Sequence, residues 1–178
     1  MKGANRGFKK KRTFIFKLVR LILTLFIVFI IFPRIGVYSF IFDRGSYRDN
    51  YFQGEIISDL EELSPNTKKL AYKFLERCEE EGLSVIVTET YRTQERQEKL
   101  YAQGRTEEGN KVTWTRNSNH TKRHAFDIAK AGSDPYGDME FFRKCADIAL
   151  EVGLTPGYYF KTYKDPPHME FNAWWLKK

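Results

Sequence analysis

An uninterrupted apolar run, Leu21 to Phe32, dominates the N-terminal hydrophobic pattern. Pro33 and Arg34 break it, and residues 35–42 continue with aromatic side chains typical of membrane interfaces. Together, residues 21–42 reach the length of about 20 residues that a membrane-spanning helix needs. The first run alone has the length of a signal-peptide core, but no Ala-x-Ala cleavage pattern follows. We therefore predict a transmembrane anchor, with a cleaved signal segment as the alternative.

Beyond residue 63 the pattern changes to shorter elements. Helical periodicity and capping residues predict helices over 65–81, 94–103 and 139–152. Runs rich in β-branched or aromatic residues predict strands over 83–90, 125–129, 158–160 and 168–171. Because helices and strands do not alternate regularly, we expect an α+β fold, in which flanking helices cover a small, mainly antiparallel sheet.

The same pattern divides the chain into four parts. Residues 1–20 form a basic head, 21–42 the anchor or signal segment, and 43–63 a linker of turn formers and charges. Residues 64–178 form the folded domain, which is long enough for one modest hydrophobic core.

The charge distribution sets the expected orientation. The formal net charge is +7, but eight basic residues and no acid precede Leu21. The remainder carries 22 basic and 23 acidic residues, so it offers no broad surface for nucleic acid. A basic head before an apolar stretch predicts an N-inside orientation, with the domain outside the cell membrane, single-pass or secreted after signal cleavage. The sequence indicates no protein partner.

Two cysteines, Cys78 and Cys145, lie on the apolar stripes of their predicted helices. We interpret them as buried free thiols, with a disulfide between the helices as the alternative outside the cell.

The chemistry-bearing residues are concentrated in two segments, Ser118–Asp127 and Asp165–His168. All three histidines of the chain lie in them. Two imidazoles and a carboxylate suit an open catalytic metal site, and a second carboxylate is available as a base.

His120 and Asp127 are seven positions apart, so on a regular strand they would point to opposite faces. They can share one metal only if the chain turns between them, and Thr121-Lys122-Arg123 is polar enough to do so. The alternative for Asp127 is a buried ion pair. A helical zinc pair of His120 and His124 is disfavoured, because no Glu follows the first histidine.

Asp165 and His168 flank two prolines, which exclude a helix interior. A turn through Pro166 brings its outer residues within about 7 Å, although Pro167 suits the third position only if its peptide bond is cis. We hypothesise a rigid turn that fixes Asp165 relative to His168; an ordinary surface turn is the alternative.

These segments resemble a known family. Ser-x-His-x-x-Gly-x-Ala-x-Asp with a later Glu/Asp-x-x-His is similar to the zinc peptidases of the D-Ala-D-Ala carboxypeptidase (VanY-like) group. Tyr91-Arg92-Thr93 leading into a Gln-containing helix and Gly104-Arg105-Thr106 resembles its L-alanyl-D-glutamate endopeptidase branch, which includes phage endolysins. The likeness runs from about Asn66 to Phe171.

The resemblance implies one zinc ion and a role for each matching residue. His120, Asp127 and His168 would be the ligands, and Asp165 the general base. Arg92 would act in the cleft near substrate oxygens, with Gln97 and Ser118 beside the site as substrate contacts. We interpret His124 as the replacement of the family's Gly, which implies either a less constrained backbone at this position or an imidazole that lines the cleft. His124 is also a weak candidate for an extra ligand.

The implied function is a metallopeptidase, a hydrolase that cuts peptidoglycan stem peptides in the cell wall, most plainly at the L-Ala-D-Glu bond. Removal of a terminal D-Ala is the alternative on the same fold. A non-catalytic, zinc-stabilised wall-binding module is the rival from another class, and Asp165 argues against it because such a module needs no base.

Overall fold

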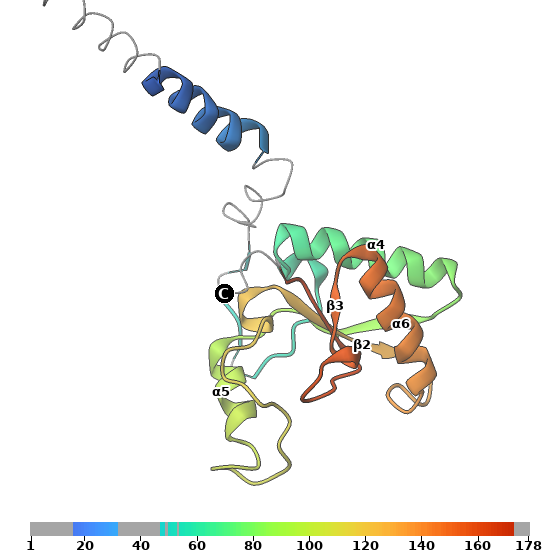
Figure 1. The fold of residues 1–178 in the computed structure, drawn as a ribbon. Helices are drawn as coiled ribbons and strands as arrows, with labels where there is room; N and C mark the ends of the chain where they lie inside the picture. Colours follow the sequence, from blue (N-terminus) through green and yellow to red (C-terminus); the bar gives the residue numbers. More distant parts are fainter. Residues whose placement is uncertain (1–15, 32–46, 49, 53, 173–178) are drawn as a thin grey trace, which may run out of the picture. The chain divides into compact units, whose positions relative to one another are not determined.

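The computed structural model describes residues 16–31, 47–48, 50–52 and 54–172. The chain divides into two compact units, Met1–Asp43 and Arg44–Lys178 (Figure 1).

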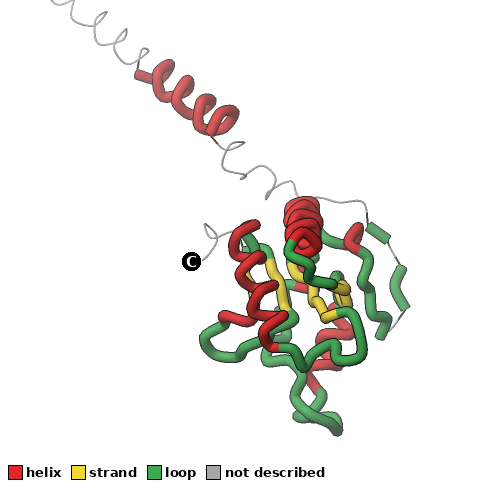
Figure 2. Tube along the Cα trace, turned by 90° about the vertical axis from the view of Figure 1, so that its right-hand side faces the viewer, coloured by secondary structure: helices red, strands yellow, loops and turns green. Residues whose placement is uncertain are grey.

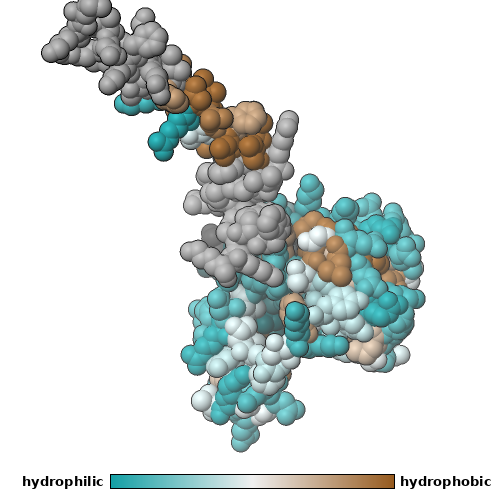
Figure 3. All heavy atoms as spheres, in the orientation of Figure 1, coloured by the Kyte–Doolittle hydropathy of each residue, from teal (hydrophilic) through white to brown (hydrophobic). Residues whose placement is uncertain are grey.

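The described part of the first unit is helical. Residues 16–26 form an α-helix that continues into the π-helical turn η1, Ile27–Ile31, and hydrophobic side chains cover much of its surface (Figure 3). Among the described residues, no helix combines the length and apolar character needed to cross a membrane. Residues 32–42 of the predicted anchor lie outside the described residues, so the anchor stays a prediction.

The second unit is built on a four-stranded sheet with strand order β1-β2-β4-β3. The strands are β1 Val85–Glu89, β2 Ala125–Lys130, β4 His168–Glu170 and β3 Thr155–Pro156. Each neighbouring pair is antiparallel, which confirms the predicted sheet. The register places Glu89 opposite Asp127, and Asp127 opposite His168, so these three residues form one row across the sheet.

Two helices cover one face of this sheet. They are α4, Pro65–Glu80, and α6, Met139–Val152, which contact each other and share the buried core with β2 and β4 (Figures 1 and 2). Phe126 and Ile128 are fully buried in this core, and the Phe126 ring centroid lies 5.8 Å from that of Phe74. Because side chains alternate along a strand, Asp127 points to the opposite face.

The helix starts follow the predicted capping residues, with one difference. Thr93 caps α5, Gln94–Ala102, and Asp138 caps α6 by accepting backbone hydrogen bonds. Ser64 precedes α4, but its hydroxyl pairs with the Thr67 hydroxyl at 2.8 Å and makes no cap bond. Both cysteines are buried free thiols, as interpreted from their positions.

Two sequence predictions need correction. Tyr158–Phe160 is not a strand: the 3-10 turn η4, Gly157–Tyr159, follows the two-residue strand β3, and its aromatic residues mimic a strand pattern locally.

The linker interpretation of 43–63 is also wrong for its described part. Ile57 and Leu63 are buried, the 3-10 turn η2 spans Leu60–Glu62, and the Ile57 carbonyl accepts the Thr90 amide at 2.6 Å. These residues add apolar burial to the second unit, so they pack against the domain.

Candidate metal centre

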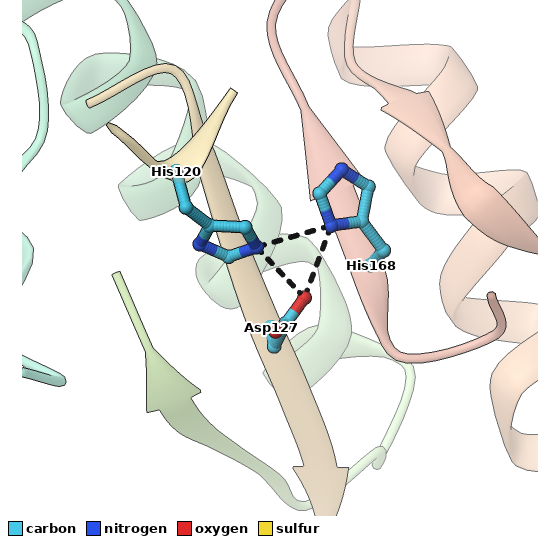
Figure 4. Close-up of side chains that lie close together, drawn as sticks. All are labelled: His120, Asp127 and His168. Atoms are coloured by element: carbon cyan, nitrogen blue, oxygen red, sulfur yellow. Dashed lines mark hydrogen bonds and ion pairs between the residues drawn. The ribbon is translucent and has the colours of Figure 1, made fainter. Parts of the chain in front are cut away.

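Three side chains from distant parts of the chain converge at one point (Figure 4). They are His120 from the 3-10 turn η3, His120–Lys122, Asp127 from β2 and His168 from β4. His120 Nε2 lies 3.2 Å from Asp127 Oδ1 and 3.2 Å from His168 Nδ1, and His168 Nδ1 lies 3.1 Å from Asp127 Oδ1. One nitrogen from each imidazole and one carboxylate oxygen thus face a common centre, which is the arrangement of a metal site.

The backbone explains why these side chains meet. Asp127 and His168 are direct partners in the β2–β4 register, so they share one face of the sheet. His120 reaches them because the chain turns through η3 and leaves it at Arg123, whose φ of 64° is left-handed. The Arg123 amide donates to the His120 carbonyl at 3.1 Å and closes this turn. The expected reversal between His120 and Asp127 is therefore present.

Outer partners fix the orientation of both imidazoles. His120 Nδ1 lies 2.7 Å from the Thr90 carbonyl oxygen, which can only accept, so Nδ1 carries the proton and Nε2 presents its lone pair. His168 Nε2 lies 3.1 Å from Glu170 Oε2, which leaves His168 Nδ1 free in the same way. The sequence analysis missed both partners. Glu170 could have been found, because it lies two positions beyond His168 on a strand and shares its face.

Arg92 supports the carboxylate of this cluster. Its guanidinium makes a two-point ion pair with the buried Glu89, with Nε 3.0 Å from Oε1, and its Nη2 lies 3.6 Å from Asp127 Oδ2. Arg96 also pairs with Glu89, at 3.0 Å. Burial favours protonation of Glu89, but the two arginines hold its pKa below the usual range. The sequence analysis did not identify Glu89.

The prediction that Gln97 contacts substrate does not fit the structure. Gln97 is fully buried and does not line the cleft. Its Oε1 accepts from Arg92 Nη1 at 2.8 Å, and its Nε2 donates to the Thr115 carbonyl at 2.6 Å. Gln97 therefore positions Arg92 and a loop rather than reaching a ligand.

The electrostatics of the cluster favour a cation at its centre. Burial alone would raise the pKa of the Asp127 carboxyl group, but the His120 and His168 imidazoles hold it far below its usual range. Burial acts to lower the pKa of His168, yet Asp127 and Glu170 raise it to about 10. The first shift reflects neighbours that stabilise the negative carboxylate of Asp127, and the second reflects carboxylates that stabilise positive charge beside His168. With two imidazole nitrogens and a carboxylate oxygen as donors, the residues fit a divalent metal.

Asp165 is held beside this cluster by the Pro-Pro turn. The His168 amide donates to the Asp165 carbonyl at 3.0 Å, which is the hydrogen bond of a four-residue turn. No peptide bond in the described residues is cis. Burial raises the pKa of the Asp165 carboxyl group, with the Asp127 charge adding to the effect and His168 opposing it.

The Pro-Pro turn also requires a glycine at position 157. Its carbonyl accepts the Asp165 amide at 3.0 Å. A Cβ at Gly157 would lie 2.4 Å from the Asp165 carbonyl oxygen and 3.0 Å from the His168 Cβ. The first of these contacts is with backbone, so any side chain at Gly157 displaces the turn.

We predict that Gly157→Ala lowers metal affinity by about 10- to 100-fold, because a displaced His168 loses its alignment with Asp127. Competition with a chromophoric chelator measures this loss. Gly153→Ala is the control, since its Cβ meets nothing within 4 Å although φ is +96°. It should cost stability through backbone strain alone and leave metal affinity unchanged. Equal metal affinity in the Gly157 variant and the native protein would contradict the prediction.

A cleft of about 1020 Å³ opens onto the cluster. Ser118 lines it, and its hydroxyl accepts the His120 amide at 3.2 Å. Its other lining residues include Arg92, Asp165, Trp114, Tyr136 and Tyr163.

His124 lies outside the metal cluster. Its ring is edge-on to that of Phe171, with centroids 6.4 Å apart, and it is not among the residues grouped around the centre. Its backbone φ is not positive, because the left-handed residue is the preceding Arg123. Counted from Ser118, the Gly of the related motif falls on Arg123, whose φ of 64° is left-handed, so the sequence prediction placed the substitution one residue too late. His124 is not one of the grouped ligand residues.

Comparison with known proteins supports the same interpretation. A family model described as VanY, D-alanyl-D-alanine carboxypeptidase, matches residues 60–176. The chain is 33% identical over 122 residues to the peptidoglycan L-alanyl-D-glutamate endopeptidase CwlK of Bacillus subtilis (strain 168), covering 61% of this chain and 73% of that protein. It is 28% identical to the L-alanyl-D-glutamate peptidase of Listeria phage A118, covering 69% of this chain but only 43% of the phage protein.

Solved structures share the fold. The L-Ala D-Glu endopeptidase ChiX of Serratia marcescens aligns with a TM-score of 0.52 at 21% identity, covering 68% of this chain and 89% of that one. The vancomycin resistance D,D-pentapeptidase VanY, solved as a mutant in complex with Zn(II), aligns with a TM-score of 0.50 at 18% identity, covering 66% and 76%.

Proposed function

The chain belongs to the VanY family, and from this premise we propose that it is a zinc-dependent endopeptidase that cleaves the L-Ala-D-Glu bond of peptidoglycan stem peptides. The observation that carries the proposal is the convergence of His120, Asp127 and His168 at the floor of an open cleft. The wider assignment, a peptidoglycan-cleaving peptidase of the VanY and CwlK group, follows from the family itself.

Zinc suits the donor set, because it prefers imidazole nitrogen with carboxylate oxygen and keeps an open position in catalytic sites. When bound, it supplies Lewis-acid activation of water and of the scissile carbonyl group. The protein prepares the site by fixing both imidazole tautomers through Thr90 and Glu170.

Asp165 is the proposed general base. It lines the cleft, and the Pro-Pro turn fixes it relative to the ligand His168. Its carboxylate would accept the proton of the attacking water and pass it to the leaving amine. Arg92 would assist indirectly by holding Asp127 in place through their ion pair.

The contacts that the Arg92 guanidinium already makes within the protein favour the endopeptidase over the D-Ala carboxypeptidase. A carboxypeptidase would use a guanidinium to clamp the free terminal carboxylate of its substrate by a two-point pair. Here Arg92 already makes that pair with Glu89, and its Nη1 donates to Gln97. Two curated relatives are also named for cleavage between L-alanine and D-glutamate. The carboxypeptidase remains the second candidate because the family model carries that description.

We also propose that the catalytic unit lies on the outer side of the cell membrane, tethered by residues 21–42 or released after signal cleavage. The basic residues before Leu21 support this orientation, since positive charge stays on the cytoplasmic side. Peptidoglycan lies on that outer side and would be within reach.

Digestion of purified muropeptides tests the activity. The zinc-loaded protein should release a peptide that begins with D-Glu, identified by mass spectrometry, and a chelator should stop the reaction. Release of free D-Ala would instead establish the carboxypeptidase. Binding to peptidoglycan without any product would favour the non-catalytic wall-binding module.

A further inference from the structure

Two half-exposed aromatic side chains join separate loops at the cleft. The Trp114 and Tyr163 rings stack with centroids 4.2 Å apart and an interplanar angle of 11°. Both residues line the cleft, and they are 51% and 50% exposed. Trp114 comes from the segment after α5, and Tyr163 from the segment that leads into Asp165. The stack is therefore a bridge between two parts of the cleft lining.

The Trp114 side of this bridge is tied to the metal cluster by polar contacts. The Gln97 amide nitrogen donates to the carbonyl of Thr115, next to Trp114, at 2.6 Å. The Gln97 amide oxygen accepts from Arg92, and Arg92 pairs with Asp127. Movement of Trp114 is thus limited by a mainly buried chain of contacts that ends at the metal centre.

The Tyr163 side of the stack is also connected to the metal cluster. Tyr163 lies two residues before Asp165, whose carbonyl accepts the His168 amide, and His168 Nδ1 contacts Asp127 at 3.1 Å. These contacts therefore form a closed ring that runs from Asp127 through Trp114 and Tyr163 and back to Asp127. We call this ring of contacts the circuit. Most members of this circuit line the cleft.

The stack of Trp114 on Tyr163 is the weakest non-covalent contact of the circuit. The other non-covalent links are hydrogen bonds or ion pairs in which the side chains of Arg92, Gln97 and His168 are buried, whereas both stacked rings are half-exposed. An aromatic pair of this kind shifts an open–closed equilibrium by only about 2- to 10-fold. The circuit will therefore open at the stack before it opens elsewhere.

We propose that Trp114 and Tyr163 form a clasp that determines which substrates enter the cleft. With the clasp closed, the cleft accepts a peptide that ends within it. A peptide that continues on both sides of the scissile bond needs the clasp open, because the stacked rings join two segments of the cleft lining and limit the room for its flanking chain. This inference rests on the proposed function and adds to it a length-dependent selection of substrate.

The clasp has a measurable consequence. When only the open form binds a ligand, the apparent affinity is reduced by the fraction of open molecules. Removing the stack should therefore lower the KM for the extended substrate by about 2- to 10-fold, with kcat unchanged. The KM for a short peptide should not fall, since that peptide enters without opening the clasp.

The experiment compares two substrates that contain the same scissile bond. One is a free tripeptide beginning with L-Ala-D-Glu, and the other is an uncross-linked glycan strand carrying full stem peptides. Trp114→Ala and Tyr163→Ala should each lower the KM for the strand, and the double variant should give no further decrease. Trp114→Phe keeps a ring and should retain the native KM. Tyr136→Ala is the matched control, because Tyr136 is a cleft aromatic that is 51% exposed and lies outside the circuit.

The outcomes separate the two proposals. If the native protein cleaves neither substrate, the proposed function fails. If it cleaves both, but Trp114→Ala leaves the KM for the strand unchanged or raises it, the clasp is refuted alone. An equal decrease in KM for Tyr136→Ala would refute it as well, because the effect would then come from a wider cleft and not from the stack.

Discussion

Replacing His168 by alanine is expected to remove zinc binding and, with it, all measurable hydrolysis. Loss of an outer partner of a metal ligand already costs about 10- to 100-fold in affinity, and loss of the ligand itself should exceed the upper value. The variant also leaves Asp127 with only one imidazole neighbour and Glu170 without its histidine partner. Zinc content per protein after dialysis, measured by elemental analysis, checks the result.

His124→Ala is the matched control for this prediction. It removes the remaining histidine of the chain, which lies between two proposed ligands in sequence yet outside the cluster in space. This variant should keep one zinc per molecule. Circular dichroism should show the same secondary structure in both variants, so that loss of metal is not confused with unfolding. Full zinc occupancy in His168→Ala would show that the cluster is not the metal site.

Replacing Asp165 by asparagine is expected to separate metal binding from turnover. The amide cannot accept the proton of the attacking water, and general bases contribute typically about 10²- to 10⁴-fold to the rate. The backbone hydrogen bonds that Asp165 makes with Gly157 and His168 do not depend on its carboxylate. The variant should therefore bind zinc normally while kcat falls by that factor.

Asp134→Asn is the matched control, because it removes a carboxylate that lies outside the cleft lining. Asp134 lies outside the cleft lining, and its Oδ1 accepts the Gly137 amide at 2.9 Å, which an amide oxygen can also do. Its activity should match the native protein. The base assignment would be wrong if zinc-loaded Asp165→Asn retained native kcat. Loss of zinc in that variant would instead assign Asp165 to the metal.

Helices that are marked by capping residues and an apolar stripe in their own sequence were predicted well. Helix α6 has an apolar stripe along its length, the Asp138 cap at its start and the left-handed Gly153 at its end, and all three signals lie within or next to the helix. The Tyr158–Phe160 strand was predicted wrongly because three aromatic residues satisfy a strand pattern locally, while the Gly157 carbonyl accepts the amides of Phe160 and Asp165 and closes a 3-10 turn there. The segment 43–63 was misjudged for a similar reason, since Ile57 and Leu63 find their apolar partners only in the folded unit.

The family and the residue types of the site could be predicted before any coordinates were known. The chain has only three histidines, so the motifs that contain them could be recognised without coordinates, and the family match confirms that recognition. The contacts that hold those groups in place could be identified only from the folded chain. The pairing of Glu89 with Asp127, the contact of Thr90 with His120 and the Trp114–Tyr163 stack arise from segments far apart in the chain. The close approach of Gly157 to Asp165 and His168 likewise depends on how the loop between them folds. Such contacts depend on strand register and loop packing, which residue spacing along one chain does not encode.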